Sequence, residues 1–284
     1  MKSIRLPWTI HIFALLHAVV ALVCRTAGID DQLFLTVLTM AMGLIICIKM
    51  DLKTEFTATV VIFANVSHEL RTPITVVRGY TESLVDGVVS DEERRQQYYN
   101  RMLSECQSME RLVGDLLLLS KMQNPDFQIE KEPVTLQQVF YDIKRTAWAI
   151  ADERNIAIEV NQPEEPCLMM ADYVRLRQMF VVIVDNAIKF SKDGASIYIN
   201  IEEKENIRVS IRDEGVGITE EELPYIFEKF YKSKLRQNAK GSGLGLAIAR
   251  QICLKHDGTI QVESKAGEGT TFTFTFPKME EIIA

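Results

Sequence analysis

The chain has few cysteines, and none of them is spaced for metal or redox chemistry. Its five cysteines are scattered through 284 residues without a C-x-x-C pair. Paired spacings of that kind are typical of zinc sites, and a high density of cysteine is typical of disulfide scaffolds. The sequence therefore indicates neither, and it favours a reducing compartment for the polar part of the chain.

Clusters of Lys and Arg are also missing. The formal net charge is -7 and the pI is about 5.3, whereas a nucleic-acid surface needs grouped basic residues. We therefore expect no nucleic-acid partner. There is no long-period repeat and no low-complexity tract, and 47% hydrophobic residues provide enough apolar material for two domains and a small appendage.

The N-terminal part, residues 1–55, has little charge. Residues 8–23 and 33–48 form two apolar runs of 16 residues separated by the polar turn "CRTAGIDDQ", and each run is slightly shorter than the roughly 17 to 25 residues that span a bilayer. Lys2 and Arg5 precede the first run and two lysines follow the second. The pattern predicts a membrane helical hairpin with both ends in the cytoplasm. The alternatives are two buried helices of a soluble domain, or an N-terminus that belongs to another context.

Residues 56–124 have the apolar spacing of two amphipathic helices. Apolar residues recur every three or four positions in both halves, and the break "DGVVSDEE" places an N-cap at Ser90 or Asp91. Asn124 and Pro125 are expected to end the second helix. The apolar stripes are too wide for one partner helix. We therefore predict a hairpin that dimerises into a four-helix bundle.

Residues 125–284 change to a mixed α/β pattern. Helical stretches are expected at 136–152, 173–190 and 244–256, interleaved with β-rich runs. This pattern predicts an α/β sandwich, with one sheet covered by helices. The expected strands lie in "FQIEKEPV", "IAIEVNQ", "SIYINIEEK", "NIRVSIRDEG", "TIQVES" and "TFTFTFP".

Several short motifs follow one another in a fixed order. "NVSHELRTPIT" (residues 65–75) lies in the first amphipathic helix. The α/β part contains "DNAIKFS", "RDEGVGI", "FEKFYK", "GSGLGLAIA" and "GEGTTFTF". The glycine spacing matches neither the G-x-G-x-x-G of dinucleotide-binding folds nor the G-x-x-x-x-G-K of P-loops.

Taken together, these motifs resemble those of sensor histidine kinases of two-component systems, over about residues 60–278. The resemblance implies a dimerisation and phospho-acceptor hairpin followed by a Bergerat-type ATPase domain. It also implies ATP and Mg²⁺ as cofactors, a homodimer, and a response regulator receiver domain as partner. The expected location is the inner or cytoplasmic membrane of a bacterium, with cytoplasmic catalytic domains and membrane attachment through about residues 8–50.

The resemblance assigns roles to residues of the α/β part. It implies that Asn186 binds Mg²⁺, a hard cation that prefers oxygen ligands, that Lys189 meets a phosphate, and that Asp213 accepts a hydrogen bond from the adenine amino group. Alternate glycines that open a helix can direct backbone N–H groups at phosphates. The polar stretch 227–241 is expected to be a mobile lid. The expected nucleotide-binding residues are Asn186, Lys189, Phe190, Asp213, Gly215, Gly217, Ile218, Phe227, Phe230, Tyr231, Lys232, Gly241, Ser242, Gly243, Leu244, Gly245, Leu246 and Thr270.

The histidine motif carries the expected catalytic residues His68, Glu69 and Thr72. A neutral imidazole has a lone pair that can attack a phosphorus atom, and Glu69 can orient the ring and accept its proton. The resemblance implies that His68 is phosphorylated from MgATP and that the group passes to an aspartate of the regulator. It also implies that Thr72 can orient a water for dephosphorylation of the partner.

One position departs from the family pattern. Val182 stands one helical turn before Asn186, where the family usually has Asn or, in its hydrolytic relatives, a carboxylate. A valine can neither activate water nor bind metal. The alternative hypothesis is therefore a catalytically weak ATP-binding module that gates a partner through its conformation. A soluble protein-serine kinase of the same ATPase fold is disfavoured because it would not need the histidine motif.

Overall fold

The computed structural model describes residues 64–233 and 241–279. The chain divides into two units, Met1–Ser67 and His68–Ala284, and the features below belong to the second, apart from residues 64–67 at the start of the first described helix. The membrane hairpin predicted for residues 1–55 lies outside the described residues. In the part of the chain that the structure describes, no helix is both long enough and apolar enough to cross a bilayer.

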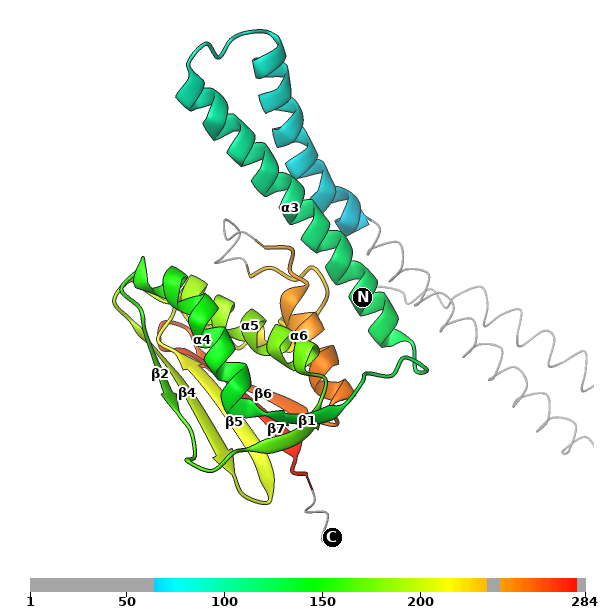
Figure 1. Cartoon of the computed structure of the whole chain (residues 1–284), viewed down its shortest axis with the longest axis vertical. Helices are drawn as coiled ribbons and strands as arrows, with labels where there is room; N and C mark the ends of the chain where they lie inside the picture. The colour runs from blue at the N-terminus through cyan, green and yellow to red at the C-terminus, as the bar shows by residue number, and fades with distance from the viewer. Residues whose placement is uncertain (1–63, 234–240, 280–284) are drawn as a thin grey trace, which may run out of the picture. The chain divides into compact units, whose positions relative to one another are not determined.

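Two antiparallel helices form the hairpin (Figure 1). One helix is described over residues 64–85, and the other is α3 (Glu92–Gln123). The side chain of Asp91 caps α3 by accepting a hydrogen bond from the Arg94 N–H at 3.1 Å, and Asn124 is its C-cap. The start and end that the sequence predicts for this helix are therefore confirmed.

The apolar stripe of α3 is only partly buried. Leu112, Leu118, Leu119 and Met122 are buried, whereas other apolar side chains of this helix face solvent in the single chain. Between the helices, the rings of Tyr80 and Tyr98 pack with centroids 4.5 Å apart. The exposed apolar residues of α3 include Leu103, Val113 and Leu117.

A five-stranded sheet follows, with the strand order β2-β4-β5-β7-β6. The β2–β4 pair is parallel and the other three pairs are antiparallel. The small β1–β3 ladder is antiparallel, and helices α4, α5 and α6 lie over one face of the large sheet (Figure 1). The bounds are β1 (Glu132–Thr135), α4 (Leu136–Asp152), β2 (Ala157–Asn161), β3 (Leu168–Ala171), α5 (Tyr173–Phe190), β4 (Ser196–Glu203), β5 (Asn206–Asp213), η1 (Leu223–Tyr225), α6 (Gly245–Lys255), β6 (Thr259–Lys265) and β7 (Gly269–Pro277).

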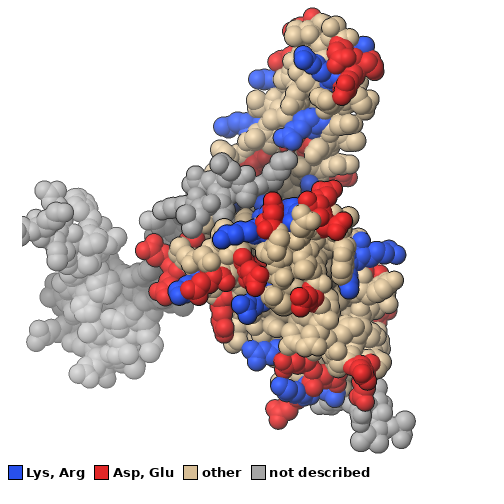
Figure 2. Space-filling view, turned by 90° about the vertical axis from the view of Figure 1, so that its left-hand side faces the viewer, with Lys and Arg blue, Asp and Glu red and all other residues tan. Residues whose placement is uncertain are grey.

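The core lies between the sheet and this helical layer. Strand β5 alternates buried and more exposed residues, as expected for a sheet covered on one face. The Phe180 ring of α5 packs against Phe140 of α4 at 4.7 Å and Phe274 of β7 at 5.3 Å between centroids. On the surface shown in Figure 2, Lys and Arg side chains are interspersed with Asp and Glu.

Candidate functional site

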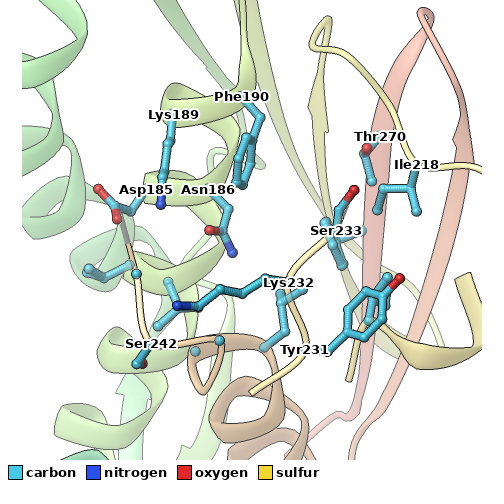
Figure 3. Close-up of a pocket in the computed structure, with 18 of the residues that line it drawn as sticks. Asp185, Asn186, Lys189, Phe190, Ile218, Tyr231, Lys232, Ser233, Ser242 and Thr270 are labelled. Carbon is cyan, nitrogen blue, oxygen red and sulfur yellow. The ribbon is translucent and has the colours of Figure 1, made fainter. Parts of the chain in front are cut away.

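A cavity of about 370 Å³ opens beside α5, between the ends of β5 and β7 and the N-terminus of α6. Figure 3 shows that Asn186 and Lys189 of α5 point into the same space as Lys232 and Ser242. The expected site residues that line the cavity are Asn186, Lys189, Phe190, Asp213, Ile218, Tyr231, Lys232, Gly241, Ser242, Gly243, Gly245, Leu246 and Thr270.

Asp213 and Thr270 form one end of the cavity. They are partners in the β5–β7 ladder, so their side chains lie next to each other on the same face. Both are buried, and the Asp213 carboxylate accepts a hydrogen bond from the Gly215 N–H at 2.8 Å. A Cβ on Gly215 would lie 2.6 Å from the Phe190 carbonyl oxygen. Glycine is therefore required for the tight turn that positions this carboxylate.

Ser264 of β6 connects the same end of the cavity to the loop after β5. Its hydroxyl donates to the Gly269 carbonyl at 2.7 Å and accepts from the Ile218 N–H at 2.8 Å. The Thr270 hydroxyl lies 2.9 Å away. Because the single Ser264 proton is directed at Gly269, Thr270 must donate to Ser264. Thr270 therefore presents acceptor lone pairs to the cavity.

The opposite end of the cavity combines cations with a helix N-terminus. Gly241 lies close to the Lys189 ammonium, because a Cβ at Gly241 would be 3.3 Å from Nζ. The N-cap of α6, Leu244, makes no side-chain capping hydrogen bond, so backbone N–H groups of the first turn are available to an anion. This end of the cavity suits phosphate groups.

Val182 lines the cavity between Asn186 and α6. A Cβ at Gly245 would lie 3.0 Å from Val182 Cγ1, so the valine methyl group packs against the first residue of α6. At the position where the family usually has Asn, Val182 therefore makes an apolar contact with Gly245 at the start of α6. The nearby side-chain oxygens from α5 belong to Asp185 and Asn186.

The ends of the expected lid are joined to each other. The Phe230 N–H donates to the Gly243 carbonyl at 2.9 Å, and both residues have a positive φ, 63° and 72°. Phe227 packs edge-on against Phe272, with ring centroids 6.5 Å apart. Phe227 and Phe230 therefore anchor this segment on the domain. Residues 234–240 of the expected lid lie outside the described residues.

The histidine helix reaches the rim of the cavity through an ion pair. Lys232 Nζ lies 2.7 Å from Glu69 Oε1 and 2.8 Å from Oε2. His68 and Thr72 are exposed. The cavity rim and the side chain next to His68 are therefore in direct contact.

Two titratable groups of the cavity lining have shifted pKa values. Burial raises the pKa of the Asp115 carboxyl, and the Arg111 charge partly opposes this shift. Burial also raises the pKa of the Tyr231 phenol, and the carboxylate of Glu222 adds to the shift. Arg111 and Asp115 come from α3, so the hairpin contributes charged groups of both signs to the lining.

Comparison with known proteins agrees with this geometry. Residues 61–125 match the family described as His Kinase A (phospho-acceptor) domain, and residues 171–280 match the histidine kinase-, DNA gyrase B- and HSP90-like ATPases. The sensor histidine kinase WalK of Bacillus subtilis (strain 168) is 35% identical over 223 residues, which are 77% of this chain and 36% of WalK. The chain belongs to the sensor histidine kinase family.

Solved histidine kinases show the same fold. The Acinetobacter baumannii histidine kinase AdeS aligns with a TM-score of 0.62 and 28% identity, covering 74% of this chain and 98% of that one. Histidine kinase ThkA in complex with response regulator protein TrrA gives a TM-score of 0.63 and 27% identity, covering 78% and 62%. The assignment to this family, which the sequence motifs predicted, is therefore confirmed.

Some expected site residues of the histidine kinase do not line the cavity. Gly215 and Gly217 shape the loop behind Asp213, Phe227 and Phe230 anchor the lid segment, and Leu244 is buried. Several lining residues were missed by sequence reasoning, because no local motif marks them and only tertiary packing brings them to the cavity from α3, α5, β7 and the chain between β5 and α6. These residues include Arg111, Asp115, Val181, Ile226, Ser233 and Phe272.

Proposed function

We propose that this histidine kinase transfers the γ-phosphoryl group of ATP to its own His68 and then to an aspartate in the receiver domain of a response regulator. The observation that carries the proposal is the cavity itself. It combines a buried carboxylate, an amide, a lysine and a helix N-terminus, and its rim residue Lys232 contacts Glu69 beside His68.

The two ends of the cavity suit the two ends of ATP. Asp213 accepts a hydrogen bond from the adenine amino group, while the acceptor orientation of Thr270 favours a donor on the base or a bridging water. Lys189 and the first turn of α6 bind the phosphates. Nucleotide binding in this orientation directs the γ-phosphate toward the rim at Lys232.

Oxygen donors at the phosphate end fit Mg²⁺. The Asn186 amide lines the cavity next to the Asp185 carboxylate, and Mg²⁺ prefers oxygen ligands that it shares with phosphate. Asn186 would hold the ion. When bound, Mg²⁺ neutralises the charge that develops on the phosphate oxygens during transfer.

The transfer step needs a neutral imidazole and a base. One ring nitrogen of His68 forms the N–P bond as the bond from the γ-phosphorus to the bridging oxygen of ADP breaks. The proton on the other nitrogen passes to the Glu69 carboxylate. Because phosphoryl transfer depends mainly on positioning and charge neutralisation, Val182 does not prevent this reaction.

The phosphoryl acceptor after His68 is a receiver domain. ThkA, which is similar in fold over most of this chain, was solved in complex with a response regulator. Thr72 lies one helical turn after His68, where it would orient a water that dephosphorylates the regulator. The exposure of both side chains supports access by a partner protein.

Dimerisation and membrane attachment complete the proposal. The exposed apolar residues of α3 would pack against a second copy in a four-helix bundle. The apolar runs in residues 8–50 would attach the chain to the bacterial cytoplasmic membrane. Fractionation checks the attachment, because recovery of the full chain in the soluble fraction without detergent would contradict it.

The phosphohistidine mechanism is tested by incubating the full chain with labelled MgATP. The parent is expected to acquire an acid-labile, base-stable label that His68→Gln and Asn186→Ala both lose, because one variant lacks the acceptor and the other the metal ligand. An ATP-bound but unlabelled parent would instead support the conformational ATP-binding module.

A further inference from the structure

Lys232 lies between the Glu69 carboxylate and the cavity. Its ammonium contacts both Glu69 oxygens, and the side chains of Lys232 and Glu69 are only 32% and 23% exposed. Lys232 also lines the cavity, and Figure 3 shows its ammonium directed into the space shared with Asn186. The same ammonium is therefore within reach of Glu69 and of a ligand in the cavity.

A nucleotide phosphate is a competitor for this ammonium. Lysine is a compact charge on a flexible stem, so it can exchange partners without movement of the backbone. A triphosphate carries more negative charge than a carboxylate, and partial burial of the site strengthens its attraction for the cation.

We propose that Lys232 is a positioning residue shared between Glu69 and the nucleotide. A phosphate in the cavity draws the ammonium away from Glu69, and the freed carboxylate then becomes available to the ring of His68. The inference rests on the proposed function, because it assumes that the cavity binds ATP.

Exchange of this kind links ATP binding to the proton acceptor. While both Glu69 oxygens contact the Lys232 ammonium, the carboxylate is engaged in an ion pair and is not available to the ring of His68. After release, Glu69 can accept the proton that leaves His68. Glu69 is thus freed only when ATP binds, so it does not deprotonate His68 in the absence of the phosphoryl donor.

A double-mutant cycle on nucleotide affinity tests the exchange without relying on activity. The full chain is titrated with Mg²⁺ and the non-hydrolysable β,γ-imido analogue of ATP in four forms: parent, Glu69→Gln, Lys232→Met and the double variant. If the Glu69 carboxylate and the nucleotide phosphates compete for Lys232, Glu69→Gln is expected to tighten binding by about three- to fivefold. This corresponds to the free energy of one partly exposed ion pair. Lys232→Met weakens binding, and the double variant binds like Lys232→Met.

Two controls separate the exchange from a general charge effect. Lys232→Arg keeps the cation, so the gain from Glu69→Gln should persist in that background. Glu202→Gln and Lys204→Met remove an exposed ion pair with a distance of 2.9 Å that does not line the cavity. Both should leave the affinity unchanged.

The remaining outcomes would contradict either the exchange of Lys232 between partners or the proposed function. An unchanged affinity in Glu69→Gln, or an equal gain in the Lys232→Met background, would show that Glu69 and the nucleotide do not compete for Lys232. The proposed function would then stand while the exchange is rejected. Failure of the parent to bind the analogue would overturn the proposed function, and the exchange with it.

Discussion

His256 lies between the end of α6 and the start of α5, and both of its ring nitrogens have partners. Nδ1 lies 2.8 Å from the Ile252 carbonyl oxygen, and Nε2 accepts from the Asp172 N–H at 3.0 Å. The side chain is 1% exposed. This arrangement requires the neutral ring, protonated on Nδ1 only. Burial is the main cause that lowers the pKa of His256.

The lowered pKa predicts a loss of stability in mild acid. Below about pH 6.5 the unfolded chain binds a proton at this histidine that the folded chain does not. The free energy of unfolding therefore falls as the pH decreases from 6.5 toward the folded pKa. We expect His256→Gln to be less stable than the parent by about 1–3 kcal/mol at pH 7.5, and the gap should narrow at pH 5.5. Urea denaturation at the two pH values measures it, and an equal gap at both would contradict this account.

At the scale of elements, the Ser264 side chain connects the loop after β5 to the start of β7. Its hydroxyl bonds to the backbone of Ile218 and Gly269 and to Thr270. Ser264→Ala leaves these groups without their partner, so we expect a loss of about 1–3 kcal/mol in unfolding free energy and weaker ATP binding. Thermal unfolding and nucleotide titration provide the measurements. Ser210→Ala, on strand β5 of the same sheet and away from the cavity lining, is the matched control and should bind ATP as the parent does.

The sequence identified most elements because their patterns are local. The alternation in β4, β5 and β7 and the caps of α3 predicted these elements well. Strand β3 was missed because "LMMA" is a four-residue apolar run without clear alternation. Ser264 and Arg111 were missed for another reason. Each looks like an ordinary polar residue of its own element, and only the β6–β7 register or the position of α3 brings it to the site.

At the scale of the whole molecule, the exposed apolar residues of α3 predict self-association. Leu103 and Leu117 are 58% and 59% exposed, and covering them in a bundle would remove apolar area from water. Leu117→Glu is expected to shift the full chain from dimer to monomer, because it places a charge in the interface. Light scattering during size-exclusion chromatography measures the mass. Ser104→Glu, an exposed position on another face of α3, should leave a dimer intact, and a monomeric parent would refute the prediction.

The hydrogen bond between Phe230 and Gly243 determines which part of the chain can change in length without changing the fold. It holds Phe230 and Gly243 next to each other, so the distance between these two residues does not depend on the length of the chain between Ser233 and Gly241. For a flexible segment closed at its base, doubling the length costs only about 0.6 kcal/mol of closure entropy. Changes of length between Ser233 and Gly241 should therefore be tolerated by the fold, whereas Tyr231, Lys232, Ser233, Gly241 and Ser242 should be retained because they line the cavity. The length of the chain between Ser233 and Gly241 can then vary while the two ends of the cavity keep their spacing.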